Sequence, residues 1–174
     1  MTSRKILTAA AVAALLSVCG CVSSTKVESN RAADYTPNIK KLFILPNLGK
    51  TLITVDGNET GHVLALLKAG FEGCGITATG YAVQALATPK AIDDAAPDAV
   101  LDIAWTKQTQ QGYDNTVDYL VSLYDRHGKA IVWKATIELN QHLKAAEELS
   151  YAITSRMQKD GLVGAACVTP KPNL

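Results

Sequence analysis

The residue types in this 174-residue chain that most readily do chemistry are four cysteines and three histidines. A thiol can be acylated, oxidised to a disulfide, used as a nucleophile or bound to a metal ion, depending on its surroundings. The histidines, His62, His127 and His142, are far apart, and none forms the i, i+4 pair that holds zinc on a helix. His127 beside Asp125 could bind a metal weakly, but polar residues are expected at a turn for structural reasons alone. We therefore expect no metal site and no cofactor.

The N-terminal segment has the layout of a secretory signal. A basic start is followed by an apolar run from Ile6 to Val18. The run is too short to cross a bilayer, because a spanning helix needs about 20 apolar residues. Leu15 to Cys21, read Leu-Leu-Ser-Val-Cys-Gly-Cys, resembles the lipobox of bacterial lipoproteins. The resemblance implies cleavage before a cysteine whose thiol is then acylated, for example by palmitate.

Two cysteines compete for acylation. Cys21 follows the small residue Gly20, whereas Cys19 would place the bulky Val18 at the cut. We therefore predict that Cys21 is the lipidated residue, with an ordinary cleaved signal and a coincidental cysteine as the alternative. Val22 follows it, in place of the aspartate that resembles an inner-membrane retention signal. This favours the periplasmic face of the outer membrane.

The remaining composition is that of an ordinary globular domain, with 48% hydrophobic and 19% charged residues over the whole chain. Removing Arg4 and Lys5 with the signal leaves 15 basic and 16 acidic residues, a formal charge of about −1. A general nucleic-acid binder would carry a basic face, so we expect no nucleic-acid partner. The expected organisation is a signal peptide at 1–20, a lipidated flexible tether at 21–40, a single domain at 41–168 and a frayed end at 169–174.

Hydrophobic periodicity predicts the elements of the domain. Strands are expected at 41–45, 51–55, 76–83 and 99–105, helices at 59–73 and 141–159, a short helical turn at 88–95, a hairpin at 116–139 and an edge strand at 162–168. Asn58 and Asn140 are the expected helix N-caps. The polar segment Thr106 to Asn115 is either a strand extension or an exposed loop. This order indicates an α+β fold, with a mixed, mainly antiparallel sheet of four to six strands and two helices packed on one face.

The hairpin carries a second resemblance. Residues 119 to 135 read Tyr-Leu-Val-Ser-Leu-Tyr-Asp-Arg-His-Gly-Lys-Ala-Ile-Val-Trp-Lys-Ala. They resemble a hairpin shared by several small periplasmic lipoprotein families, including ones of unknown function, in which a Trp-bearing strand precedes the last helix. The resemblance implies an accessory subunit of an envelope assembly, similar in architecture to the curli-secretion and lipopolysaccharide-assembly lipoproteins.

With Cys21 assigned to lipid, Cys74 and Cys167 remain as an even pair in an oxidising compartment. Each follows a predicted helix, so a disulfide between them requires the two helix ends to be neighbours. Two separate buried thiols are the alternative, because free cysteine is among the most buried residue types. A nucleophilic cysteine is a third reading.

No catalytic motif stands out, because the chain has neither a Gly-x-Ser-x-Gly elbow nor a phosphate-binding loop. We expect a membrane-anchored periplasmic lipoprotein that is not an enzyme and acts as a binding or assembly accessory for an envelope protein partner. A small envelope hydrolase or redox enzyme with an unrecognised site is the alternative. Loops on a rigid scaffold often carry recognition, so Gln110, Gln111 and Tyr113 are the expected partner contacts. Tyr81 and Tyr124 are further candidates for exposure.

Overall fold

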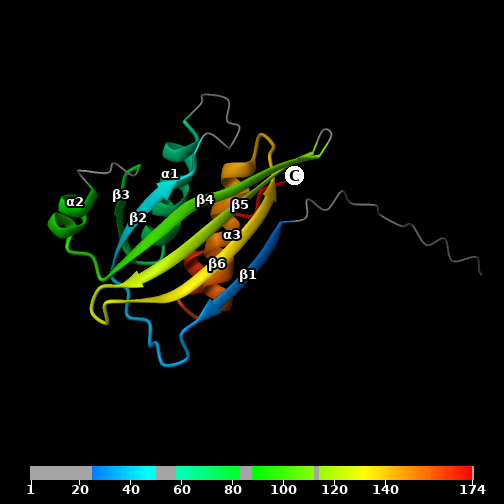
Figure 1. Ribbon diagram of the computed structural model, residues 1–174. Coiled ribbons are helices and arrows are strands. Elements are labelled where there is room, and N and C mark those ends of the chain that lie inside the picture. Colours follow the sequence, from blue (N-terminus) through cyan, green and yellow to red (C-terminus); the bar gives the residue numbers. More distant parts are fainter. Residues whose placement is uncertain (1–24, 50–57, 83–87, 112–113, 174) are drawn as a thin grey trace, which may run out of the picture.

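The computed structural model describes residues 25–49, 58–82, 88–111 and 114–173. The elements are β1 (Lys26–Arg31), β2 (Lys41–Asn47), α1 (Glu59–Glu72), β3 (Thr77–Gly80), α2 (Thr88–Ala95), β4 (Ala99–Gln111), β5 (Asp114–Asp125), β6 (Ala130–Asn140), α3 (Ala145–Lys159) and the 3-10 turn η1 (Ala165–Cys167). The strands form one six-stranded sheet in the order β1-β6-β5-β4-β2-β3 (Figure 1). The fold is therefore α+β. The predicted strand at 51–55 lies outside the described residues.

The sheet is mixed. The pairs β1–β6, β6–β5 and β5–β4 are antiparallel, whereas β4–β2 and β2–β3 are parallel. The parallel pairs arise because α1 connects β2 to β3, and a crossover of this kind returns the chain in the same direction. The sheet is therefore mixed, and the expectation of a mainly antiparallel sheet missed the parallel pairs β4–β2 and β2–β3.

The two faces of the sheet are covered by different helices. Leu42 and Ile44 of β2 share the main core with buried side chains of α1 and α3. Phe43 and Leu45 point to the opposite face, because successive strand residues alternate, and they pack with Ile92 of α2. The helices therefore do not share a single face. No helix within the described ranges combines the length and the apolar character needed to cross a membrane.

Helix α1 forms where the sequence predicts it. The Asn58 side-chain oxygen accepts a hydrogen bond from the Gly61 N–H at 3.2 Å, which caps the first turn. Val63, Leu67 and Phe71 recur at helical spacing and are fully buried. The short helix at 88–95 and the β5–β6 hairpin also form as expected.

Helix α3 begins later than expected, at Ala145, with Lys144 as an N-cap that makes no side-chain capping bond. Asn140 is not its cap. It is the last residue of β6, where its side chain pairs with Thr116 across the strands at 3.1 Å. The Gln141 N–H continues the ladder by donating to the Asn115 carbonyl at 2.7 Å. Strand pairing therefore uses the residues that the helix pattern assigned to a first turn.

The expected flexible tether at 21–40 is wrong for Lys26 to Arg31, which form edge strand β1 beside β6. Val27 is the only apolar residue in this strand, so the sequence has no hydrophobic alternation that would predict a strand here. Its helix-facing side is held instead by polar contacts, in which Ser29 donates to Asp160 and Arg31 donates to the Asp160 carbonyl. Such contacts depend on residues more than 120 positions away.

The described residues of the segment Thr106 to Asn115, which are 106–111 and 114–115, extend two strands and form no loop. Strand β4 continues to Gln111 and β5 starts at Asp114, with Gln108 opposite Val117 and Gln110 opposite Asn115. We call this projecting part, residues 106–111 and 114–117, the β4–β5 arm; it is visible as the long hairpin in Figure 1. Backbone pairing overrides the low strand propensity of its glutamines.

The C-terminal part also departs from expectation. Leu162 to Val168 form no strand; they contain η1, whose last residue Cys167 is bonded to Cys74. Thr169 is not frayed: it is buried, and its N–H donates to the Thr154 hydroxyl of α3 at 3.1 Å. Gly70 of α1 permits this approach, because a Cβ there would lie 2.9 Å from the Thr169 methyl. The C-terminal segment is therefore held by contacts with α1 and α3 and does not pair with the sheet.

Candidate functional site

The face of the sheet opposite α1 and α3, here called the open face, carries exposed apolar side chains. Val117, Tyr119, Val121 and Leu123 of β5 point into the main core. The alternate residues therefore point to the open face, where Leu120 is 36% exposed and Tyr124 is 37% exposed. Leu120 and Tyr124 therefore leave apolar surface open to solvent on this face.

A β-bulge adds Ile131 to the same face. Strict alternation along β6 would put Ile131 on one face with Trp133. The β5–β6 register shifts between Leu123 and Tyr124, however, so Ile131 pairs with Tyr124. Val132, the extra residue, is buried, whereas Ile131 is 48% exposed. The bulge thus turns Ile131 outward. Leu120, Tyr124 and Ile131 together are called the apolar patch.

A cleft of about 440 Å³ lies beside the apolar patch, between α2 and the sheet. Pro89 and Ile92 of α2 form one wall, and Val100 and Tyr124 form the sheet side. Arg126 closes it by donating to the Ile92 carbonyl at 3.1 Å and to the Asp93 carboxylate at 2.9 Å. The cleft is therefore mainly apolar with a charged rim, as at many protein–protein contacts.

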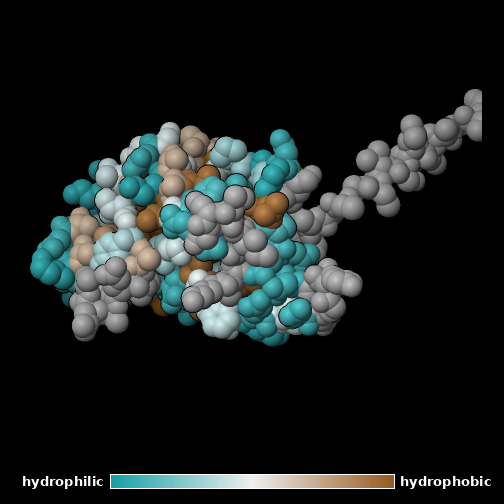
Figure 2. Space-filling view, turned by 90° about the horizontal axis from the view of Figure 1, so that it is seen from above, coloured by the Kyte–Doolittle hydropathy of each residue, from teal (hydrophilic) through white to brown (hydrophobic). Residues whose placement is uncertain are grey.

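The open face also carries Asp102, which is partly buried. Asp102 of β4 pairs with Ser122 of β5 and with Leu45 of β2. Burial raises the pKa of the Asp102 carboxyl above its usual range. Figure 2, which views the molecule from above relative to Figure 1, shows hydrophobic residues in small areas between hydrophilic ones. Polar groups thus interrupt the apolar ones on the part of the surface seen there.

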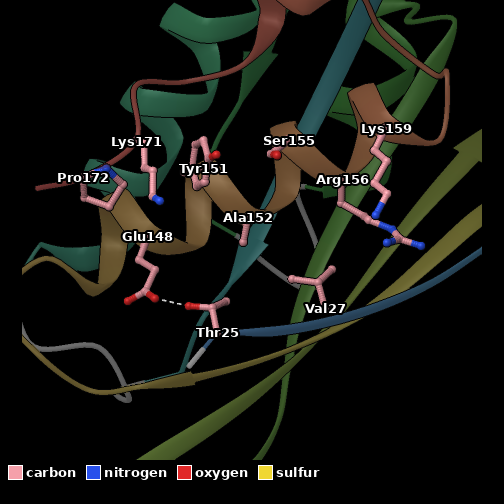
Figure 3. Close-up of a pocket in the computed structure, with 10 residues that line it drawn as sticks. All are labelled: Thr25, Val27, Glu148, Tyr151, Ala152, Ser155, Arg156, Lys159, Lys171 and Pro172. Atoms are coloured by element: carbon pink, nitrogen blue, oxygen red, sulfur yellow. Dashed lines mark hydrogen bonds between the residues drawn. The ribbon is translucent and has the colours of Figure 1, made fainter. Parts of the chain in front are cut away.

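A second cavity, of about 290 Å³, separates β1 from α3 (Figure 3). Val27 of β1 and Ala152 of α3 face it, and because both are small they leave the space between strand and helix unfilled. Lys171 and Pro172 of the C-terminal segment border it near Tyr151, as Figure 3 shows. The remaining lining residues are Thr25, Glu148, Ser155, Arg156 and Lys159.

Polar contacts close the cavity at both ends. At one end the Thr25 hydroxyl donates to the buried Glu148 carboxylate, which also contacts the His142 ring at 2.5 Å. At the other end the Arg156 Nε donates to the Ser29 hydroxyl at 2.5 Å and to Asp160 at 3.3 Å. These contacts fasten β1 to α3.

The Thr25, Glu148 and His142 cluster contains a hydroxyl, a carboxylate and an imidazole, but their order differs from that of a hydrolase triad. In a triad the imidazole contacts the hydroxyl and takes its proton. Here the carboxylate lies between the other two groups, and the hydroxyl donates to Glu148. The arrangement therefore fastens a strand and does not activate a nucleophile. Within the described ranges, no three His, Cys, Asp or Glu side chains gather closely enough to hold a metal ion.

The site residues predicted from sequence fall in different places. Cys74 and Cys167 are joined by a disulfide with Cα atoms 5.0 Å apart. Gln110 is exposed on the β4–β5 arm, while Cys21, Tyr113 and the Gln111 side chain lie outside the described residues. None of the residues of the arm belongs to the apolar patch. Exposure of Tyr124 was expected; Ile131 was missed because a bulge has no signal in the apolar pattern.

No family model matches this chain, and no curated protein matches it. Solved structures that this chain matches include the PelC dodecamer from Paraburkholderia phytofirmans, with 18% identity over 68% of this chain and 82% of that chain, and a TM-score of 0.42. They also include the lipoprotein GNA1162 from Neisseria meningitidis, with 20% identity over 68% of this chain and 98% of that chain, and a TM-score of 0.36. Identities of this size do not transfer a ligand or a partner to this chain.

Proposed function

We propose that this chain is a lipid-anchored protein of the bacterial cell envelope that acts as a binding or assembly accessory of an envelope complex. The acylated thiol of Cys21 holds it at the periplasmic face of the outer membrane. The observation that carries the binding role is the apolar patch of Leu120, Tyr124 and Ile131 beside the α2 cleft. Such surfaces favour a protein partner that covers the apolar groups.

The chemistry of the patch indicates how a partner binds. Tyrosine and arginine are enriched among the residues that contribute most to protein–protein affinity, and Tyr124 and Arg126 both line the cleft. Arg126 is already oriented by Asp93, so binding orders few additional side chains. A partner that inserts an apolar side chain into the cleft removes Tyr124 from water, and its contact beside the cleft covers Ile131.

Replacing Tyr124 and Ile131 with alanine should weaken partner binding by about 2 kcal/mol or more, a factor of about 30. Both side chains are more than one third exposed, so the melting temperature should change little. The partner is first captured from membranes with the lipidated protein and identified by mass spectrometry; its affinity for each variant is then measured by calorimetry. Unchanged affinity in the double variant would reject the patch as the contact surface.

The β4–β5 arm provides a matched comparison. Gln110, Gln111 and Tyr113 remain our second predicted contact, and their joint replacement by alanine should leave thermal stability nearly unchanged. If this variant loses the partner while the Tyr124 and Ile131 variant retains it, the contact surface is the arm. A large fall in melting temperature would assign these three residues to folding instead.

Cys21→Ser should release the protein from the membrane fraction or mislocalise it, because serine offers no thiol for acylation. In the part of the chain that the structure describes, no helix is long and apolar enough to take over as a membrane span. Fractionation and intact-mass measurement test this directly. A Cys21→Ser protein that remains in membranes at the wild-type mass would show that Cys21 is not the anchor.

A further inference from the structure

We propose that one end of the domain rests on the bilayer surface, with the Leu143 side chain inserted between lipid headgroups. We call this surface, formed by Leu143, Lys144 and Lys171, the membrane-facing end. The proposal rests on the acylation of Cys21 proposed above and adds the orientation of the domain on the membrane. Three observations carry it: the length of chain after the anchor, the exposure of Leu143 and the position of the lysines.

The anchor leaves the domain little freedom. Only four peptide steps lead from Cys21 to Thr25, the first described residue. A chain spans at most about 3.6 Å per residue, so the acylated thiol lies within about 20 Å of Thr25 even with its side chain extended. Thr25 is itself fixed, because its hydroxyl bonds the buried Glu148 carboxylate and β1 starts at the next residue. The long tether expected from sequence is therefore cut short by β1.

Leu143 lies at this same end of the molecule. It belongs to the connection between β6 and α3, and it is 68% exposed, more than any other large hydrophobic residue described. The adjacent His142 contacts the Glu148 carboxylate that also binds Thr25, so one acid links the connection to the start of β1. A rigid contact therefore holds Leu143 near the residues that follow the anchor.

Two exposed lysines accompany Leu143. Lys144 is adjacent in sequence, and its amine donates to the Asn173 carbonyl, which brings the C-terminal segment to this end. Lys171 of that segment borders the cavity beside Glu148, as Figure 3 shows. An apolar side chain flanked by cations suits a surface of anionic phospholipid, because the leucine enters the interface while the ammonium groups remain at the headgroups.

The opposite end of the sheet carries the partner surface. Lys26 at the start of β1 pairs with Glu138 of β6, whereas Ile131 lies near the other end of β6, beside the turn at 126–129. Figure 1 shows the start of β1, the C-terminus and the β4–β5 arm at one end of the sheet and this turn at the other. An anchor at the first end therefore presents the apolar patch away from the membrane.

Hydrogen exchange of the lipidated protein on vesicles tests the orientation. The protein is bound to vesicles of phosphatidylcholine with phosphatidylglycerol, and the reference is the soluble Cys21→Ser chain. We expect slower exchange at residues 141–144 on the vesicles and unchanged exchange at 126–129. Leu143→Glu should abolish the slowing while the acyl anchor still holds the protein on the vesicle. Ile131→Glu, a matched change at the other end, should leave the slowing intact.

Equal exchange at 141–144 in the bound and soluble proteins would overturn the proposal, and so would slowing that appears equally at 126–129. Slowing that persists in Leu143→Glu would also reject the role of this leucine. The result is separable from the anchor itself. If Cys21→Ser stays in the membrane fraction at the wild-type mass, the proposed acylation fails. Wild-type anchoring without slowing at 141–144 rejects only the orientation. Melting curves of both Glu variants establish that each is folded.

Discussion

Replacing Cys74 and Cys167 with alanine should lower the free energy of unfolding by up to about 4.7 kcal/mol. The bond joins residues 93 positions apart, which is most of the folded domain, and it links the end of α1 to η1. Breaking it gives the unfolded chain the conformational freedom of a loop of that size. Cys167 is also fully buried and lies against α1, so its loss disturbs packing as well.

The measurement is denaturant unfolding of the mature chain in the Cys21→Ser background, where Cys74 and Cys167 are the only thiols. Wild-type residues at these two positions should give a midpoint that falls when reductant is added. The double alanine variant serves as the control, because its midpoint should be insensitive to reductant. Two titratable thiols in the unfolded, unreduced protein from an oxidising compartment would contradict the disulfide.

Asp160→Ala should cost about 2–4 kcal/mol of stability, because it removes the acceptor shared by three donors. The Asp160 carboxylate accepts from Ser29 at 2.5 Å, from the indole N–H of Trp133 at 2.7 Å and from Arg156 at 3.3 Å. Trp133 is 1% exposed, so water cannot easily replace the lost acceptor. The same change releases β1 from the end of α3. Asp160→Asn, which keeps an acceptor oxygen, should cost less.

The stability of the native protein should also depend on Asp160 at acid pH. Burial alone raises the pKa of this carboxyl, but the hydrogen bonds from Ser29 and Trp133 and the charge of Arg156 outweigh it and hold the pKa below its usual range. The unfolded chain therefore takes up a proton first as the pH falls. This contribution is complete above the ordinary aspartate pKa of about 3.9 and is lost as the pH falls through the lower folded-state pKa.

Unfolding curves measured over this pH range should bring wild type and Asp160→Asn closer in stability as the pH decreases. The difference between the two proteins isolates Asp160 from Asp98, whose pKa is also lowered. A difference that stays constant down to the lowest pH at which both fold would show that the Asp160 charge does not stabilise the fold.

Short-range patterns in the sequence were enough for the elements whose stabilising contacts are local. Asn58 bonds its own helix three residues on, and Val63, Leu67 and Phe71 repeat at helical spacing. The two alternating strands of the β5–β6 hairpin pair across a turn of a few residues. The sequence pattern that predicts this pairing therefore lies in two neighbouring segments of the chain. The lipobox resemblance at Cys21 also rests on adjacent residues, and acylation of Cys21 stays a prediction.

Tertiary structure alone decided the elements whose stabilising contacts come from distant residues. β1 carries one apolar side chain and is held by Glu148 and Asp160, and Thr169 is held by Thr154. Hydrophobic periodicity cannot predict these partners, because a hydrogen bond between residues far apart in sequence leaves no local pattern.

The surfaces proposed for function depend on the same distinction. Strict alternation along β6 would put Ile131 on the same face as Trp133, and no other rule is available without a partner strand. The bulge opposite Tyr124 turned it outward, and the link through Glu148 set Leu143 near the start of β1. Register and long-range hydrogen bonding, which exist only between paired elements, therefore decided which side chains this protein presents.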